Sequence, residues 1–160
     1  MKRLVFASLF GVCALALFPV TASAQCSDQL LEQAAETLGE FVYVQDYRAK
    51  LKKGKKGKPN PIMKYSIILT KGTRYRFVGA SAQDFDGRLV MDLYAGAGKM
   101  GSNYDKNRAK FYDAIEFTCK RSGLYYLVLS FDEGKEGCGT AVMGFQKSGG
   151  SGIQRYLDAD

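Results

Sequence analysis

The sequence contains no histidine and no tryptophan, and only 3 of its 160 residues are proline. Without histidine, the protein lacks the side chain that most often acts as a general base, binds zinc or activates a serine or cysteine nucleophile. Histidine-dependent catalysis is therefore excluded. With 46% hydrophobic and 24% charged residues, the chain has instead the composition of one ordinary globular domain.

The first residues have the three parts of a secretory signal peptide. Lys2 and Arg3 precede an apolar run over residues 4–18, and the small residues 22–24 follow it. The apolar run is shorter than the roughly 20 residues that a membrane span needs. We expect cleavage after the last of these small residues, which leaves a chain without a transmembrane segment in the periplasm, at the cell surface or in the medium.

Export would place the cysteines in an oxidising compartment, where disulfides form. Cys13 leaves with the signal peptide, so Cys26, Cys119 and Cys138 remain, and we expect one disulfide and one buried thiol. Cys119 and Cys138 stand at opposite ends of a predicted strand, farther apart than the roughly 4.4–6.8 Å between Cα atoms that a disulfide allows. We therefore favour a disulfide between Cys26 and Cys138.

One helix is predicted over residues 27–38, because leucine and alanine recur there at helical spacing, Ser27 or Asp28 can cap its start, and Gly39 suits its end. The segments that read as strands are 41–47, 63–69, 73–79, 88–95, 111–119, 124–131 and 139–145. This pattern predicts a mainly β protein, an antiparallel β-sandwich of about seven or eight strands of jelly-roll or Greek-key type, with one N-terminal helix.

The strand around residues 124–129 is apolar on both faces, as is typical of a central strand that is covered on two sides. We expect the N-terminal helix to cover its outer face. Residues 148–152 consist of serine and glycine alone, which predicts a flexible linker. The predicted organisation is a signal peptide (1–24), a folded domain (25–146) and a flexible C-terminal tail (147–160).

Several short stretches resemble a bacterial pre-peptidase C-terminal domain. They are residues 68–77, Asp84-Phe85-Asp86 with 89–94, Gly98 with 101–103, 115–118 and 122–127, so that the resemblance covers residues 63–145. The helical region and residues 131–139 are also similar to small exported proteins of Bacteroidota. The resemblance implies a small β-sandwich module that accompanies secreted enzymes and is not itself catalytic; some modules of this family bind calcium.

The most distinctive local feature is a basic segment between residues 48 and 58. Its seven cations are Arg48, Lys50, Lys52, Lys53, Lys55, Lys56 and Lys58. Without Lys2 and Arg3 the net charge falls from +7 to +5, and without these seven cations it falls further to −2. Gly54, Gly57 and the prolines that follow predict an exposed loop rather than a helix or strand.

Two interpretations of this loop stay open. It can be a solubilising segment that protects a sheet edge, since charge runs are often merely solvated. It can also bind anions, with salt-sensitive affinity, on an envelope protein, an anionic glycan or lipopolysaccharide. Nucleic acid is not expected as a partner, because the chain is exported and no aromatic residues alternate with the lysines.

Acidic and aromatic residues define alternative functions. Asp84, Asp86 and Asp92 are candidate calcium ligands, although they match no complete calcium loop and aspartate also forms turns. No other cofactor is expected. A sugar-stacking surface would draw on tyrosines that half-buried strands also favour, namely Tyr43, Tyr47, Tyr65, Tyr94, Tyr104 and Tyr112.

A histidine-independent hydrolase would need two carboxylates that face one cleft. Asp113 with Glu116, or Asp132 with Glu133, are the candidate pairs, but no nucleophile elbow or phosphate loop accompanies them. The sequence therefore predicts a non-catalytic binding or structural accessory module of the bacterial envelope, with the lysine-rich loop for anionic partners. A carbohydrate-binding or calcium-dependent sandwich is the alternative, and a hydrolase is the second alternative.

Overall fold

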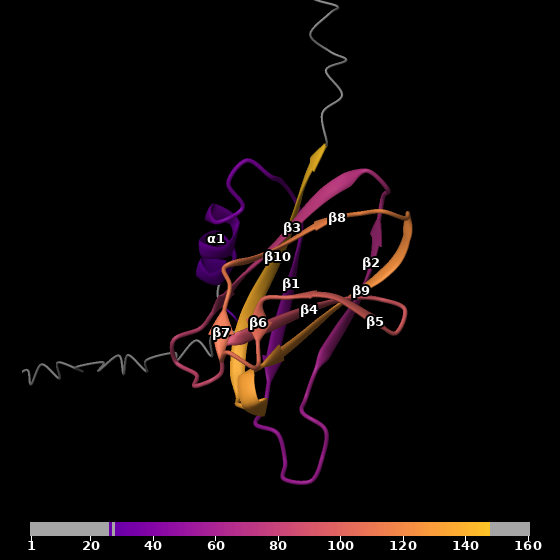
Figure 1. Ribbon diagram of the computed structural model, residues 1–160. Coiled ribbons are helices and arrows are strands. Elements are labelled where there is room, and N and C mark those ends of the chain that lie inside the picture. Colours follow the sequence, from indigo (N-terminus) through magenta and orange to yellow (C-terminus); the bar gives the residue numbers. More distant parts are fainter. Residues whose placement is uncertain (1–25, 27, 148–160) are drawn as a thin grey trace, which may run out of the picture.

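The computed structural model describes residue 26 and residues 28–147 (Figure 1). They form the helix α1 (Asp28–Glu36), the short 3-10 helix η1 (Asp132–Gly134) and ten strands. The strands are β1 (Val42–Leu51), β2 (Met63–Leu69), β3 (Thr73–Ser81), β4 (Leu89–Ala95), β5 (Gly98–Ser102), β6 (Tyr104–Asp105), β7 (Lys110–Phe111), β8 (Ala114–Thr118), β9 (Gly123–Phe131) and β10 (Gly137–Lys147). The predicted signal peptide, the capping residue Ser27 and the tail from residue 148 onward lie outside the described residues.

Eight of these strands form two four-stranded antiparallel sheets. Sheet A has the strand order β1-β10-β3-β8, and sheet B has the order β2-β9-β4-β5. Strands β6 and β7 pair with each other in a separate ribbon. The predicted fold class, mainly β with antiparallel sheets and one helix, is confirmed.

The two sheets share one hydrophobic core. Side chains alternate in burial along β9 and the second half of β2, as expected of strands with one face against a core. Fully buried side chains from both sheets meet there, including Leu69, Phe77, Met91, Leu93, Leu127 and Leu129. Removing such side chains from water, at about 25 cal/mol per Å² of apolar surface, is the main source of stability for the pair of sheets.

A second hydrophobic cluster joins α1 to the outer face of sheet A. Leu30 and Ala34 of the helix pack against Val78 of β3 and Val142 of β10. The helix ends before Gly39, whose φ of +63° is the left-handed conformation that commonly stops a helix. Figure 1 shows α1 beside β10 and β3, so helix, sheet A and sheet B are stacked in that order. Among the described residues, no helix is long and apolar enough to cross a membrane.

The position of α1 corrects one expectation. The helix does not cover the apolar strand around residues 124–129, which is β9 in sheet B. Sheet A also has an apolar outer face, formed by Val78, Ala80 and Val142, and α1 packs there. Leu124 of β9 consequently stays 53% exposed, and no helix of the described residues packs on the outer face of sheet B.

The predicted strands correspond to observed strands, but several bounds differ and one predicted strand is divided. Strand β2 has the predicted bounds, whereas β1 continues four residues beyond the predicted end. The predicted strand 111–119 is divided, because Phe111 pairs with Tyr104 in the ribbon while Ile115 pairs with Phe77 of β3. The sequence does not predict β5, whose glycines have low strand propensity, or β6, which is only two residues long.

Cys26 and Cys138 form a disulfide with their Cα atoms 5.4 Å apart, which agrees with the predicted pairing. Cys119 is free and buried, and its thiol donates a hydrogen bond to the Arg121 carbonyl oxygen at 3.1 Å. The disulfide joins the residue before α1 to β10, a middle strand of sheet A. It thereby fixes the helix against the face that the helix covers.

Replacing Cys26 and Cys138 together by alanine should lower the free energy of unfolding. The disulfide spans 112 residues of sequence, and bridges that close long loops restrict the unfolded chain most. We expect a loss of about 2–4 kcal/mol in urea unfolding. Cys119→Ala removes a buried thiol but no bridge, so it should cost less; equal stability of the double variant and the wild type would contradict this prediction.

Candidate functional site

The structure divides the seven cations of the basic segment into two groups. Arg48 and Lys50 belong to β1, and Arg48 forms ion pairs with Asp28 at 3.0 Å and with Asp46 at 3.2 Å. Hydrogen bonds to these carboxylates raise the pKa of Arg48 above its ordinary value. Arg48 therefore ties β1 to α1, and it lies in a strand rather than in the predicted loop.

The remaining five cations form the connection between β1 and β2. We call residues 52–62 the lysine loop; its cations are Lys52, Lys53, Lys55, Lys56 and Lys58, and all five are exposed. In Figure 1 the loop projects from one end of the two sheets. Within the part of the chain that the structure describes, none of the five takes part in an ion pair.

The base of the lysine loop is fixed to η1. The Gly54 amide donates a hydrogen bond to the Gly134 carbonyl oxygen at 2.8 Å, and the Lys58 amide closes a turn with the Lys55 carbonyl oxygen at 3.0 Å. The carboxylates of η1 do not neutralise the loop, because Asp132 and Glu133 pair with Lys135 at 2.7 and 3.2 Å. Hydrogen bonds to these two carboxylates raise the pKa of Lys135. The loop thus presents uncompensated positive charge on an anchored backbone.

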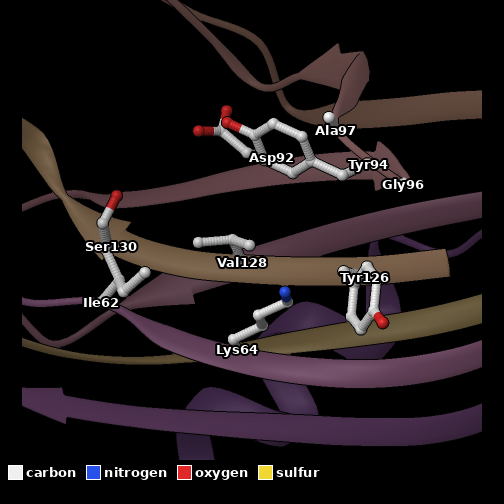
Figure 2. Close-up of a pocket in the computed structure, with 9 residues that line it drawn as sticks. All are labelled: Ile62, Lys64, Asp92, Tyr94, Gly96, Ala97, Tyr126, Val128 and Ser130. Carbon is white, nitrogen blue, oxygen red and sulfur yellow. The ribbon is translucent and has the colours of Figure 1, made fainter.

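A hollow of about 370 Å³ lies on the uncovered outer face of sheet B (Figure 2). Its residues come from the end of the lysine loop, β2, β9, β4 and the β4–β5 turn, and they are Ile62, Lys64, Asp92, Tyr94, Gly96, Ala97, Tyr126, Val128 and Ser130. The strand register places Lys64, Val128 and Asp92 in one row across the sheet. Tyr126 and Tyr94 are paired in the adjacent row.

The charged groups of this hollow differ in their partners. The Lys64 ammonium lies 3.7 Å from the centre of the Tyr126 ring, in a cation–π contact. No ion pair of the described residues includes Lys64. Asp92 instead accepts a hydrogen bond from the Ser102 hydroxyl at 2.6 Å and forms an ion pair with Lys99 at 2.7 Å. Lys64 therefore supplies the hollow's unpaired positive charge.

A second hollow, of about 400 Å³, adjoins the first and shares Asp92 and Ser130 with it. It is lined by Lys99, Ser102, Tyr104, Lys106 and residues of η1, and also by Asn60 of the lysine loop. Together the two hollows form a groove, which we call the sheet B groove. It leads from the tyrosines of the middle strands to the base of the lysine loop.

Asn103 holds the segment that forms one wall of the second hollow. This buried side chain accepts a hydrogen bond from the Met91 amide at 2.7 Å and donates one to the Leu89 carbonyl oxygen at 3.1 Å. The backbone carbonyl oxygen of Asn103 accepts a hydrogen bond from the Tyr112 amide at 2.8 Å. Asn103 thus continues the pairing along β4 beyond β5, a role that no pattern in the sequence indicates.

The three aspartates proposed as calcium ligands are not brought together. Asp84 lies in a different hollow with Gln29 and Gln33, beside the first half of α1, whereas Asp92 lies in the sheet B groove. Asp86 is exposed. Among the described residues no group of three or more acidic, cysteine or histidine side chains is placed to hold a metal ion.

The tyrosines proposed as a sugar-stacking surface have different locations. Tyr47 and Tyr65 pack together in or against the core with ring centres 5.1 Å apart, and burial raises the pKa of Tyr47 to about 12. Tyr43 donates a hydrogen bond to Asp46 at 2.8 Å, and Tyr112 lies near Lys110. Only Tyr94 and Tyr104 line the sheet B groove, which also contains the unpredicted Tyr126.

The carboxylate pairs considered for hydrolysis are occupied by cations. In the candidate pair of Asp113 and Glu116, Glu116 forms an ion pair with Arg74 and lies 3.9 Å from Arg76. Asp132 and Glu133 both contact Lys135. Neither candidate pair therefore presents two free carboxylates to one cleft.

No protein-family model matches this chain, and no curated protein matches its sequence.

Calcium should leave the thermal stability unchanged. Asp92 is already engaged by Lys99, and the other two aspartates lie elsewhere, so six to eight oxygen ligands do not converge. We expect a change in Tm of less than about 1 °C on addition of about 5 mM calcium chloride, followed by differential scanning fluorimetry. A rise in Tm that a chelator reverses would contradict this expectation.

Asn103→Ala should destabilise the protein, because it leaves the Met91 amide and the Leu89 carbonyl without their partner in a buried place. We expect a loss of about 3 kcal/mol in urea unfolding. Asn107→Ala, at an exposed position four residues away, is the matched control and should change stability by less than about 0.5 kcal/mol. Similar losses in the two variants would show that the side-chain hydrogen bonds of Asn103 are not responsible.

Proposed function

We propose that this protein is an exported, non-catalytic binding module of the bacterial envelope that engages anionic partners through the lysine loop. The observation that carries the proposal is the loop itself: five exposed lysines without a carboxylate partner among the described residues, on a backbone that is hydrogen-bonded to η1 at its base. Clustered charge of one sign raises the local concentration of oppositely charged partners and speeds their association.

The anchoring of the loop favours a binding role over simple solubilisation. A solubilising segment needs only exposed charge, and any conformation supplies that. Here the Gly54 amide is hydrogen-bonded to the Gly134 carbonyl oxygen, and the Asn60 side chain lies next to the same glycine. Fixing the base of a loop reduces the conformational entropy that the loop loses when a ligand binds.

The cellular context follows from the sequence. The N-terminal leader predicts export, and the Cys26–Cys138 disulfide is compatible with an oxidising compartment such as the periplasm or the cell surface. The resemblance of residues 63–145 to pre-peptidase C-terminal domains agrees with an accessory, non-catalytic role. The partners that these surroundings offer are acidic envelope proteins, anionic glycans and lipopolysaccharide.

Removing charge from the lysine loop should weaken polyanion binding far more than removing it elsewhere. The test compares Lys53→Ser, Lys55→Ser and Lys56→Ser in one variant with Lys71→Ser, Lys120→Ser and Arg121→Ser in another. Both variants lose three exposed cations, and the second set lies near the β2–β3 and β8–β9 turns, at the other end of β2 and β9. The probe is inorganic polyphosphate, and the measurement is isothermal titration calorimetry over a range of salt concentrations.

We expect the loop variant to lose about tenfold or more in affinity and the control variant to stay within about twofold of the wild type. Wild-type affinity should fall as sodium chloride rises, because salt screens exposed charges. Equal losses in the two variants would mean that net charge alone attracts the anion. Binding that persists in high salt in the loop variant would also reject the proposal.

A further inference from the structure

The outer face of sheet B combines apolar, aromatic and polar groups, and no helix of the described residues covers it. Helix α1 packs only on sheet A, and β9 and β4 are the two middle strands of sheet B. Ile68 and Leu124, which are register partners at one end of this face, are 78% and 53% exposed. The sheet B groove crosses the same face and ends at the lysine loop. Exposed apolar residues rimmed by polar groups make this face a candidate binding surface.

The groove has two neighbouring rows of different chemistry. The row of Tyr126 and Tyr94 offers flat, half-buried rings, and the row of Lys64 and Asp92 offers a cation and hydrogen-bond acceptors. Figure 2 shows these four side chains around one hollow, with Ser130 beyond them. A pyranose ring has an apolar face that packs on an aromatic ring and hydroxyl groups that need hydrogen-bond partners, which suits this arrangement.

The charge of the groove selects among sugars. Asp92 is compensated by Lys99, whereas Lys64 is held over Tyr126 without a carboxylate partner in the described part of the chain. Lys106 lines the second hollow, and the lysine loop continues the positive charge beyond it. The second hollow is also lined by Asp132 and Glu133, but both of these carboxylates contact Lys135. The lining cations without a carboxylate partner among the described residues are Lys64 and Lys106, and together with the adjacent lysine loop they favour an acidic ligand.

The position of the groove argues against an extended peptide. Peptides that bind sheets add a strand at an edge, where backbone amide and carbonyl groups are free. The groove lies over β9 and β4, and β9 already pairs with β2 and β4 on its two sides. A peptide backbone would find few hydrogen-bond partners there, whereas sugar hydroxyls need only side chains.

We propose that the sheet B groove binds a linear acidic polysaccharide, whose sugar rings pack on Tyr126 and Tyr94 and whose acidic groups contact Lys64. This inference rests on the proposed function and names the class of anionic partner. The two hollows share Asp92 and Ser130, and Asn60 and Ile62 link them to the lysine loop. A chain that occupies both hollows therefore reaches the loop, whose lysines bind its next acidic groups.

The test separates sugar rings from charge with three soluble probes. Oligogalacturonate carries both rings and carboxylates, its methyl ester carries the same rings without the charge, and inorganic polyphosphate carries charge without rings. The full-length exported protein is titrated with each by calorimetry. We expect oligogalacturonate to bind at least about tenfold more tightly than its methyl ester and more tightly than polyphosphate of matched charge.

Variants of the tyrosine row locate the site. Tyr126→Ala combined with Tyr94→Ala should weaken oligogalacturonate binding about tenfold or more and leave polyphosphate binding within about twofold. Tyr126→Phe keeps the ring and should bind nearly as the wild type does. Lys64→Gln, at an exposed position, tests the same site with little risk to folding and should weaken oligogalacturonate binding more than binding of the methyl ester.

Each other outcome rejects a defined part of the account. If polyphosphate binds through the lysine loop but oligogalacturonate binds no more tightly and ignores the tyrosine and Lys64 variants, the groove inference fails and the proposed function stands. If soluble polyglutamate matches oligogalacturonate in affinity and in dependence on the tyrosines, the partner is an acidic protein segment and the polysaccharide inference fails. If no polyanion binds, both proposals fail.

Discussion

One helix can cover only one of the two sheets, and the disulfide between Cys26 and Cys138 places it on sheet A. Val78 and Val142 then have partners on the outer face of that sheet, so sheet A is packed on both sides. In the described part of the chain no helix covers the outer face of sheet B, whose side chains range from the buried Val90 to the exposed Leu124. The open face of sheet B, with its mixture of tyrosines, Lys64 and Asp92, follows from this unequal distribution of cover.

The lysine loop and the sheet B groove are adjacent because of how the chain passes between the sheets. Strand β1 is an edge of sheet A and β2 is an edge of sheet B, so the loop that connects them crosses from one sheet to the other. Its final residues enter β2 beside the groove, and its base is fixed to η1, which follows β9. Charge and groove are therefore positioned by the same connection, and an anion attracted to the loop is already close to the hollows.

The sequence predicts the regular parts of this structure and misses the parts that depend on long-range packing. The alternation of apolar and polar residues predicts the bounds of β2, and the length of a strand favours Cys26 and Cys138 as the bonded pair. The predicted position of α1 is wrong, because both sheets have apolar residues on their outer faces. Local sequence patterns do not show which of the two faces the helix covers. Arg48 was assigned to the loop because its partner Asp28 is twenty residues away in sequence. Tyr126 and Asn103 acquire their roles only from neighbours across the sheet.

Strand β10 lies between β1 and β3 in sheet A, although it is the last described strand along the chain. Until residues 137–147 have been made, β1 and β3 have no strand between them, and Cys26 lacks its bonding partner. Sheet A therefore completes its strand pairing late in synthesis, and a chain that ends before residue 137 lacks the strand that joins β1 to β3.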